Sequence, residues 1–304
     1  MSTRSPLSAK RRVLEIRATC QAAIRAFFRQ RGFLEVETPV RIAAPALENH
    51  LDAEPSGTHY LRTSPELQMK QLLGAGYERI VQMGPCFRQG EQGHWHRPEY
   101  TMLEWYRAQA DYHDILADTR ALLPAVCRAV HGTAVLSWGG RSLALDGEWT
   151  VHRVGELYRQ WAGWDPVVDF DADRFDLDWV EYIAPALAEA ATPVIVTDYP
   201  AAVAALARCK PDEPQVAERW ELFIGGVELA NAYSELTDPE EQRQRFAACT
   251  DERKQAGRTV YPLDEAFLQA LHDGLPPCGG IALGVDRLVM LLADVPHIDD
   301  VNAF

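Results

Sequence analysis

Arg88 stands where a short apolar run gives way to a polar loop, a position suited to binding phosphate. Residues 80–83 read Ile-Val-Gln-Met, and a glycine-punctuated loop after Arg88 leads to His96 and a second strand-like run at 100–106. A guanidinium stays charged at any working pH and binds phosphate oxygens as a fork. The pattern predicts an anion held above an antiparallel sheet. The competing interpretation is a surface salt bridge.

Two carboxylates flank a predicted turn of the kind that joins neighbouring strands. Glu221 and Glu228 stand on either side of Gly225-Gly226, a two-glycine sequence that favours a hairpin. A hairpin would bring the two side chains close, and two ionised carboxylates held together need a cation between them. Mg²⁺ bridging the phosphates of a nucleotide is the natural occupant. The alternative is a pair of solvated strand glutamates.

Three further acids occur in apolar strand and helix contexts. Glu66 follows Ser64-Pro65, Glu104 precedes Trp-Tyr106, and Glu235 lies in Ser-Glu-Leu. A substrate with two ammonium groups needs at least two carboxylates to offset the cost of desolvation. We therefore expect a pocket for a lysine-like molecule, since an aspartate-like substrate would require arginines there.

Composition excludes several classes of protein. The chain has 304 residues and a formal net charge of −14, with no block of five or six basic residues. A nucleic-acid binder normally carries a basic face, so the charge argues against RNA as the main partner. The opening residues lack the apolar core of a signal peptide and no long apolar run follows, so we expect a cytoplasmic protein with no membrane partner. Six scattered cysteines give no sign of zinc.

The helices and strands that must position these side chains are predicted from hydrophobic periodicity and from the positions of glycine and proline. We expect helices at 8–31, 64–74, 112–130, 238–256, 263–273 and 285–293, strands at 33–40, 78–87, 99–109, 192–198 and 279–284, and a hairpin at 219–224 and 227–231. Residues 131–190 read as an insertion packed on the sheet edge. This order predicts an α+β fold, with an antiparallel sheet flanked by helices in a single domain spanning 1–304.

Three segments resemble the motifs of the lysine-type class II aminoacyl-tRNA synthetases. Phe-Arg-x-x-Glu at 87–91, followed by His-x-Pro-Glu-aromatic-Thr-Met-x-Glu-x-Tyr at 96–106, resembles motif 2. Residues 31–39 resemble motif 1, and Gly-Gly-Ile-Ala-Leu-Gly-Val-Asp-Arg at 279–287 resembles motif 3. The resemblance implies the synthetase-like sheet, ATP as a substrate with Mg²⁺, and a homodimer formed through motif 1.

The resemblance also implies roles for individual residues. Arg88 would grip the α-phosphate and Arg287 the γ-phosphate as the catalytic pair, Tyr100 would lie under adenine, and Glu221 and Glu228 would hold the metal. The implied ATP-binding residues are Arg88, Gln89, Gly90, Glu91, His96, Arg97, Tyr100, Glu228, Leu229, Gly284 and Arg287. The implied amino-acid-binding residues are Ser64, Glu66, Glu104, Tyr106, Asn231 and Glu235, with Glu66 on the amino group near the reacting carboxyl and with Glu235 and Tyr106 on the distal ammonium.

The chain departs from the family pattern at two places in the segment expected to bind ATP. Members usually read Arg-Asn-Glu where this chain has Arg88-Gln89-Gly90, and His-Asn-Pro where it has His96-Arg97-Pro98. Gly90 removes a carboxylate from the adenine side, and Glu91 is the residue expected to replace it.

The acceptor of the activated amino acid is a separate question. Motif 1 begins about thirty residues into the chain, so we expect no anticodon-binding domain ahead of it, and residues 228–231 read Glu-Leu-Ala-Asn where lysyl-tRNA synthetases read Glu-Ile-Gly-Asn. Both features are similar to a family of synthetase paralogues, the elongation factor P–(R)-β-lysine ligases. That similarity implies elongation factor P as partner, (R)-β-lysine or lysine as substrate, and no tRNA.

Two other hypotheses stay open at this point. One is a truncated lysyl-tRNA synthetase-like enzyme that charges a tRNA or another small acceptor. The other is a non-catalytic binding paralogue, for which Gly90 and Arg97 are the only signs. Ala232 and Tyr233 also depart from the ligases' usual Gly-Phe, which leaves the exact amino acid undecided.

Overall fold

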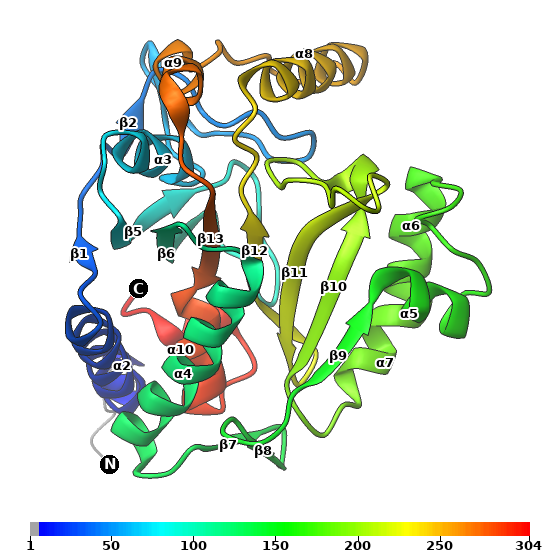
Figure 1. Ribbon diagram of the computed structural model, residues 1–304. Helices are drawn as coiled ribbons and strands as arrows, with labels where there is room; N and C mark the ends of the chain where they lie inside the picture. Colours follow the sequence, from blue (N-terminus) through cyan, green and yellow to red (C-terminus); the bar gives the residue numbers. More distant parts are fainter. Residues whose placement is uncertain (1–5) are drawn as a thin grey trace.

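An eight-stranded sheet forms the centre of the protein (Figure 1). The computed structural model describes residues 6–304, so the expectation of a missing signal peptide rests partly on residues outside this range. In spatial order the strands are β1 (Leu34–Glu35), β5 (Arg79–Phe87), β6 (Glu99–Ala108), β13 (Cys278–Gly284), β12 (Val227–Ser234), β11 (Val216–Ile224), β10 (Val194–Pro200) and β9 (Thr150–Arg153). The six inner strands are antiparallel, as predicted, whereas β1 and β9 add to the two edges in parallel.

Helices cover both faces of the sheet, which confirms the α+β class. They are α1 (Pro6–Ala9), α2 (Arg11–Gln30), α3 (Glu66–Gly74), α4 (Tyr112–His131), α5 (Val154–Trp161), α6 (Ala172–Asp178), α7 (Ala184–Ala188), α8 (Pro239–Gln255), α9 (Glu265–Gly274) and α10 (Val285–Ala293), with short turns η1 (Trp179–Ile183), η2 (Ala201–Val203) and η3 (Ile298–Val301). Two small sheets complete the fold: β2 (Arg41–Ile42), β3 (Pro55–Ser56) and β4 (His59–Leu61), and β7 (Val135–Trp138) with β8 (Arg141–Ala144).

Alternation along β6 separates the core from the site. Leu103 and Trp105 are fully buried in the core cluster that α2, α4 and α10 form on one face. Because successive side chains of a strand point to opposite faces, Glu104 and Tyr106 point to the other face. Tyr106 packs there with residues of α3 and α9.

The register across the sheet aligns site residues from four strands. Cα partners run from Glu104 to Ala282, from Ala282 to Asn231 and from Asn231 to Glu221. A parallel row joins Tyr106, Gly280, Tyr233 and Arg219. Residues of one row share a face of the sheet, so segments more than a hundred residues apart contribute to one floor.

The predicted hairpin is confirmed. Gly225 and Gly226 join β11 to β12 with φ of 56° and 84°, the positive values that a two-residue hairpin turn requires. Glu228 pairs with Phe223 next to the turn, and a single register slip between Leu222 and Phe223 moves the partner of Glu221 to Asn231.

Two predicted boundaries were wrong. The strand expected over 33–40 is limited to Leu34–Glu35, because the Gln82 side chain takes the backbone N–H of Thr38 and Pro39 has no N–H to donate. The long first helix is divided at Lys10 into α1 and α2.

Residues 131–190 pack along the β10 edge of the sheet. They contain the β7–β8 hairpin, β9 and α5 to α7. Val154, Tyr158 and Ile183 from this segment form a buried cluster with Val196 of β10 and Phe223 of β11. That the segment is an insertion into the family's core stays a prediction. Across residues 6–304, we find no helix with the length and apolar character needed to span a bilayer.

Candidate active site

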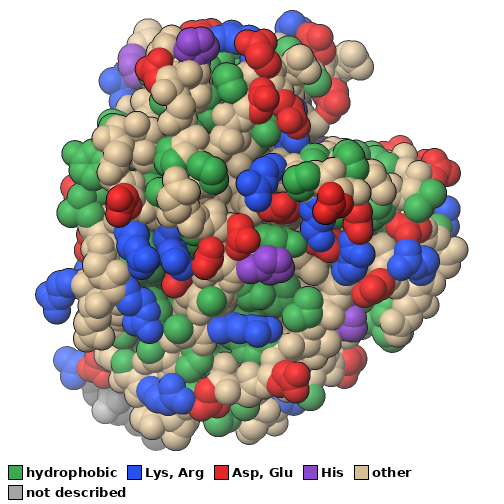
Figure 2. Space-filling view, viewed as in Figure 1, with side chains coloured by type: hydrophobic (Ala, Val, Ile, Leu, Met, Phe, Trp, Pro, Cys, Tyr) green, Lys and Arg blue, Asp and Glu red, His purple; other side chains and the backbone are tan. Residues whose placement is uncertain are grey.

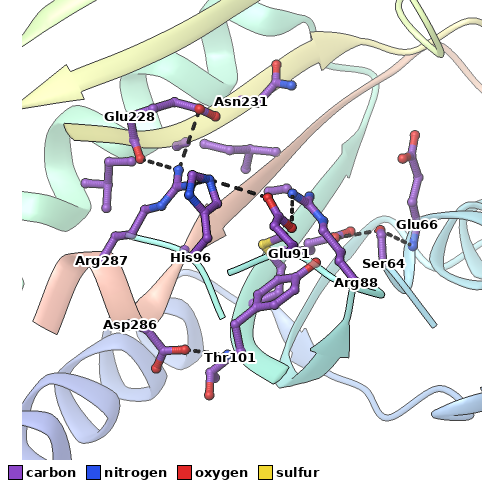
Figure 3. A pocket seen from close by; sticks show the side chains of 18 of the residues that line it. Ser64, Glu66, Arg88, Glu91, His96, Thr101, Glu228, Asn231, Asp286 and Arg287 are labelled. Carbon is purple, nitrogen blue, oxygen red and sulfur yellow. Dashed lines mark hydrogen bonds and ion pairs between the residues drawn. The ribbon is translucent and has the colours of Figure 1, made fainter. Parts of the chain in front are cut away.

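A cavity of about 260 Å³ opens on the sheet face that carries Glu104 and Tyr106. Most of the residues proposed from the sequence line it: Ser64, Glu66, Arg88, Glu91, His96, Arg97, Tyr100, Glu104, Tyr106, Glu228, Leu229, Asn231, Glu235, Gly284 and Arg287. Figure 3 shows their side chains converging from β6, β12, α10 and the loop after β5. Gln89, Gly90 and Glu221 do not line this cavity.

One end of the cavity is built from buried acids. Glu104 accepts hydrogen bonds at both oxygens, from the hydroxyl of Ser64 at 2.7 Å and from that of Tyr106 at 2.8 Å. Ser64 Oγ also accepts from the Glu66 backbone N–H at 2.9 Å, which ties the start of α3 to β6. Burial, with a contribution from the nearby Glu66, raises the pKa of Glu104 to about 7.

Lys70, which sequence reasoning missed, lies between two of the other acids. Its Nζ is 2.5 Å from Glu66 Oε1 and 2.5 Å from Glu235 Oε2, and its side chain is fully buried. Burial raises the pKa of Glu235 to about 8, although Lys70 opposes that shift. The available signal was its spacing, since Lys70 stands four residues after Glu66 on an expected helix.

The acids and Lys70 form what we call the acid subsite: Glu66, Glu104, Glu235 and Lys70. Three carboxylates against one ammonium leave two negative charges when all are ionised. Unbalanced charge in a buried site is costly, so the subsite is suited to a ligand that carries two positive charges.

Gly280 gives the acid subsite its space. A Cβ on Gly280 would lie 2.2 Å from Glu235 Oε1 and 2.2 Å from Tyr106 Cε1, distances that real contacts do not reach. We therefore expect Gly280→Ala to displace both side chains and to lower kcat/KM for the amino acid by about 10- to 100-fold, the equivalent of about 1–3 kcal/mol of overpacking.

Steady-state kinetics on amino-acid-dependent ATP–diphosphate exchange would measure this effect. Gly147→Ala is the matched control, because the nearest atom to its added Cβ is 3.8 Å away. Equal kinetics for Gly280→Ala and Gly147→Ala would contradict the assignment.

Arg88 lines the same cavity and is linked through Glu91 and His96 to Arg287. Its guanidinium lies 5.2 Å over the ring of Tyr100, whose hydroxyl donates to the Thr63 carbonyl at 2.8 Å. The one ion pair of Arg88 among the described residues is a long contact of 3.4 Å to Glu91, and its Nε has no partner. Most of its donors are therefore free to bind an anion. Glu91 lies between Arg88 and His96, and its role as a replacement for the carboxylate absent at Gly90 stays a prediction.

Arg287 connects three elements around the same cavity. It donates to the Glu228 carbonyl at 2.7 Å and to the Trp95 carbonyl at 3.2 Å, and its Nη2 lies 2.6 Å from His96 Nε2 (Figure 3). Burial and the neighbouring Arg287 lower the pKa of His96, so we infer a neutral ring whose Nε2 accepts a hydrogen bond from the guanidinium.

Comparison with known proteins identifies the family. The model of the class II tRNA synthetases for aspartate, lysine and asparagine matches residues 5–304. The chain belongs to the class II aminoacyl-tRNA synthetases. Among its relatives is the elongation factor P–(R)-β-lysine ligase of Vibrio cholerae serotype O1, 40% identical over 96% of this chain and 94% of the relative.

Two further relatives differ from each other in name. The elongation factor P–(R)-β-lysine ligase of Vibrio vulnificus is 39% identical over 96% of this chain and 94% of its own length. The lysine–tRNA ligase of Moorella thermoacetica is 38% identical over 97% of this chain and 65% of its own length.

Of the two glutamates expected to bind the metal, only Glu228 lines the cavity. Glu228 keeps a half-exposed carboxylate 3.6 Å from Arg287. Glu221 is buried and accepts from the Tyr199 hydroxyl at 2.7 Å and from Arg219 at 2.5 Å. Residues 6–304 contain no cluster of three or more His, Cys, Asp or Glu side chains that could enclose an ion. Mg²⁺ would fit beside Glu228 if phosphates and waters supplied its other ligands, as that ion prefers.

Sequence reasoning also missed the contacts that hold β6, the second strand of the motif 2 segment, in place. Asp286 accepts from the Thr101 backbone N–H at 2.8 Å and forms a short ion pair with Arg17 of α2, whose other nitrogen lies 2.8 Å from Thr101 Oγ1. Asp286 precedes Arg287 at the start of α10, so α2, β6 and α10 are fastened together directly beneath the synthetase site.

Proposed function

We propose that this synthetase-family protein activates (R)-β-lysine with ATP and transfers it to a lysine side chain of elongation factor P. The observation that carries the proposal is one cavity lined both by the three acids of the acid subsite and by the largely free Arg88. A diamino acid bound through its two ammonium groups would direct its carboxylate toward a phosphate held by Arg88.

The first step asks little of side chains as acids or bases. The carboxylate of the amino acid is already a nucleophile, and it attacks the α-phosphorus of ATP with release of diphosphate. Arg88 neutralises charge that develops on the phosphate, while the acid subsite holds the attacking group in place. Mg²⁺, held in part by Glu228, would offset the remaining phosphate charge.

The choice of amino acid and acceptor is supported by two observations. Ala230 lines the cavity beside Asn231, where lysyl-tRNA synthetases have glycine, so one methyl group reshapes the floor for an amino group displaced by one carbon. The net charge of −14 suits a protein acceptor better than a tRNA. The names of the Vibrio relatives agree with this choice.

We also propose a homodimer formed through residues 31–39, and action in the cytoplasm. The edge strand β1 lies in this segment, and its Leu34 is 50% exposed. An exposed leucine on an edge strand favours burial against a second copy.

Binding of the amino acid should strengthen as the pH rises from 6 to 8. Glu104 and Glu235 have pKa values raised to about 7 and about 8, so both are largely protonated at pH 6 and must ionise to pair with ammonium groups. The charged groups around them are Glu66, Lys70 and Arg62. KM for the amino acid should fall about tenfold over this range. Initial rates at fixed saturating ATP would measure it, and Glu104→Gln should remove the lower inflection; a flat profile would contradict the assignment.

The function is tested in two half-reactions. ATP–diphosphate exchange compares (R)-β-lysine, (S)-β-lysine and L-lysine, and transfer of the labelled amino acid compares elongation factor P with total tRNA. Exchange strongest with (R)-β-lysine and label on elongation factor P support the proposal. Exchange with L-lysine and label on tRNA would instead support a lysyl-tRNA synthetase-like enzyme. No exchange in folded protein with Mg²⁺ would leave a binding paralogue.

A further inference from the structure

A second cavity, of about 520 Å³, lies beside the first; we call it the lateral cavity. Its walls come from β11, from α8, and from Phe175, Asp176 and Trp179 of the 131–190 segment. Figure 1 shows α8 and α6 facing each other across this part of the molecule, and Figure 2 shows the surface notched between them. Glu48 lines both cavities, so it stands where they meet.

The Glu48 carboxylate is free. Within residues 6–304, no hydrogen bond or ion pair engages it, although its backbone carbonyl accepts from Arg253 at 2.6 Å. Burial raises the pKa of this carboxyl, and Arg88, Glu66, Arg219 and Arg253 act on it from the surrounding elements, with Tyr233 and Cys249 also nearby. A half-buried carboxylate that lines two cavities and lacks a hydrogen-bond partner is available to a ligand in either of them.

Gln242 gives a second sign that the lateral cavity receives a ligand. This residue of α8 is fully buried and lines the cavity, yet neither its amide nitrogen nor its amide oxygen has a hydrogen-bond partner within residues 6–304. Buried polar atoms are nearly always paired in native proteins, so the amide is available to a bound polar group.

The charges of the lateral cavity favour a cation. Its carboxylates are Glu48, Asp176, Glu221 and Glu252, and its arginines are Arg219 and Arg245. Both arginines are already neutralised: Arg219 pairs with Glu221 at 2.5 Å, and Arg245 pairs with Glu241 at 2.5 Å. The remaining carboxylates therefore outnumber the available cations.

The second half-reaction, unlike the first, needs a group that removes a proton from the nucleophile. A lysine side chain arrives as an ammonium, with a pKa of about 10.4, and has no lone pair with which to attack the adenylate. We propose that the lateral cavity admits the acceptor lysine and that Glu48 takes the proton it must lose before attack. This inference rests on the proposed function and adds the base and the entry route.

Attack by the lysine side chain removes two protons from its nitrogen and replaces one bond of the adenylate. Of the three protons on the ammonium, one passes to Glu48, one leaves with the departing phosphate or to water, and one stays on the new amide. The C–N bond forms as the C–O bond between the carbonyl carbon and the phosphate breaks, and AMP is released.

Glu48→Gln and Glu48→Asp test the base. Transfer from pre-formed adenylate to elongation factor P is followed in a single turnover, and adenylation is measured separately by ATP–diphosphate exchange. Loss of a general base costs about 10²-fold or more, so we expect transfer in Glu48→Gln to fall at least ten times further than adenylation. Glu48→Asp should recover part of the rate, and the rise of transfer with pH should lose its lower inflection in Glu48→Gln.

Hydroxylamine separates base catalysis from positioning. It is largely unprotonated near neutral pH and needs no base, so as acceptor it should restore most of the transfer rate lost in Glu48→Gln. Equal losses with hydroxylamine and elongation factor P, or equal losses in adenylation and transfer, would overturn the role of Glu48. Absence of exchange in the unaltered protein would overturn the proposed function itself.

A bulky side chain tests the route. Ala202 is exposed at the wall of the lateral cavity, and Ala202→Trp should slow transfer to elongation factor P at least tenfold without slowing transfer to hydroxylamine. Ala266→Trp, at an exposed position on α9 away from both cavities, is the matched control. Unchanged transfer in Ala202→Trp would place the entry elsewhere.

Discussion

Replacing Arg88 with alanine is expected to lower kcat/KM for amino-acid-dependent ATP–diphosphate exchange by about 10³-fold. A preorganised donor to developing phosphate charge is worth about 10²–10³ in rate, and we propose that the guanidinium also binds ATP. The structure supports a large effect, since Arg88 is held over Tyr100 and makes only a 3.4 Å contact with Glu91. Its charge is not already committed to a strong internal pair.

Two further variants sharpen this test. Arg88→Lys keeps the charge but loses the fork, so it should recover only part of the rate. Arg25→Ala is the control, because Arg25 of α2 forms an exposed 2.9 Å pair with Glu35 of β1, and such pairs are worth little. If Arg88→Ala and Arg25→Ala behaved alike, Arg88 would be a surface residue and the phosphate subsite would have to be sought elsewhere.

Replacing Lys70 with methionine is expected to destabilise the protein by about 3–5 kcal/mol at pH 8, the usual cost of removing one partner of a buried ion pair. Glu66 and Glu235 would lose a cation 2.5 Å from each of them, inside a fully buried environment. Urea unfolding followed by circular dichroism would measure the change.

The loss of stability in Lys70→Met is also expected to depend on pH. A carboxyl whose folded pKa is raised destabilises the fold increasingly above its ordinary pKa of 4.5 and fully above the folded pKa. Because removal of Lys70 raises that folded pKa further, the extra loss in Lys70→Met should be largest near pH 8 and should shrink as the pH falls to 6. The double variant Lys70→Met/Glu235→Gln should regain much of the lost stability. Lys254→Met, at an exposed lysine 3.1 Å from Asp251, should change little. A fully additive double variant would show that the two side chains do not depend on each other.

The two cavities divide the proposed reaction between them. The first holds the groups that a carboxylate and a phosphate need, and the lateral cavity holds the unpaired Glu48 that an incoming ammonium needs. Transfer can therefore be impaired without an equal loss of adenylation, which makes the two half-reactions separable by mutation.

Local sequence determined the elements and the chemistry of the main site. Alternation along 99–108 placed Glu104 and Tyr106 on one face, the two glycines at 225–226 specified the hairpin, and the spacing between Arg88 and His96 indicated the phosphate loop. Each of these features depends on neighbours within a few residues, or on one turn, so sequence pattern was sufficient.

Tertiary structure alone decided which charges meet. It placed Lys70 between Glu66 and Glu235, brought Glu48 to the junction of two cavities, and gave Glu221 to Arg219 and Tyr199. It also shortened β1 to two residues and, through a single register slip, paired Glu221 with Asn231. Partners far apart in the chain are chosen by packing and by the cost of burying an unpaired charge, and neither quantity can be read from local sequence.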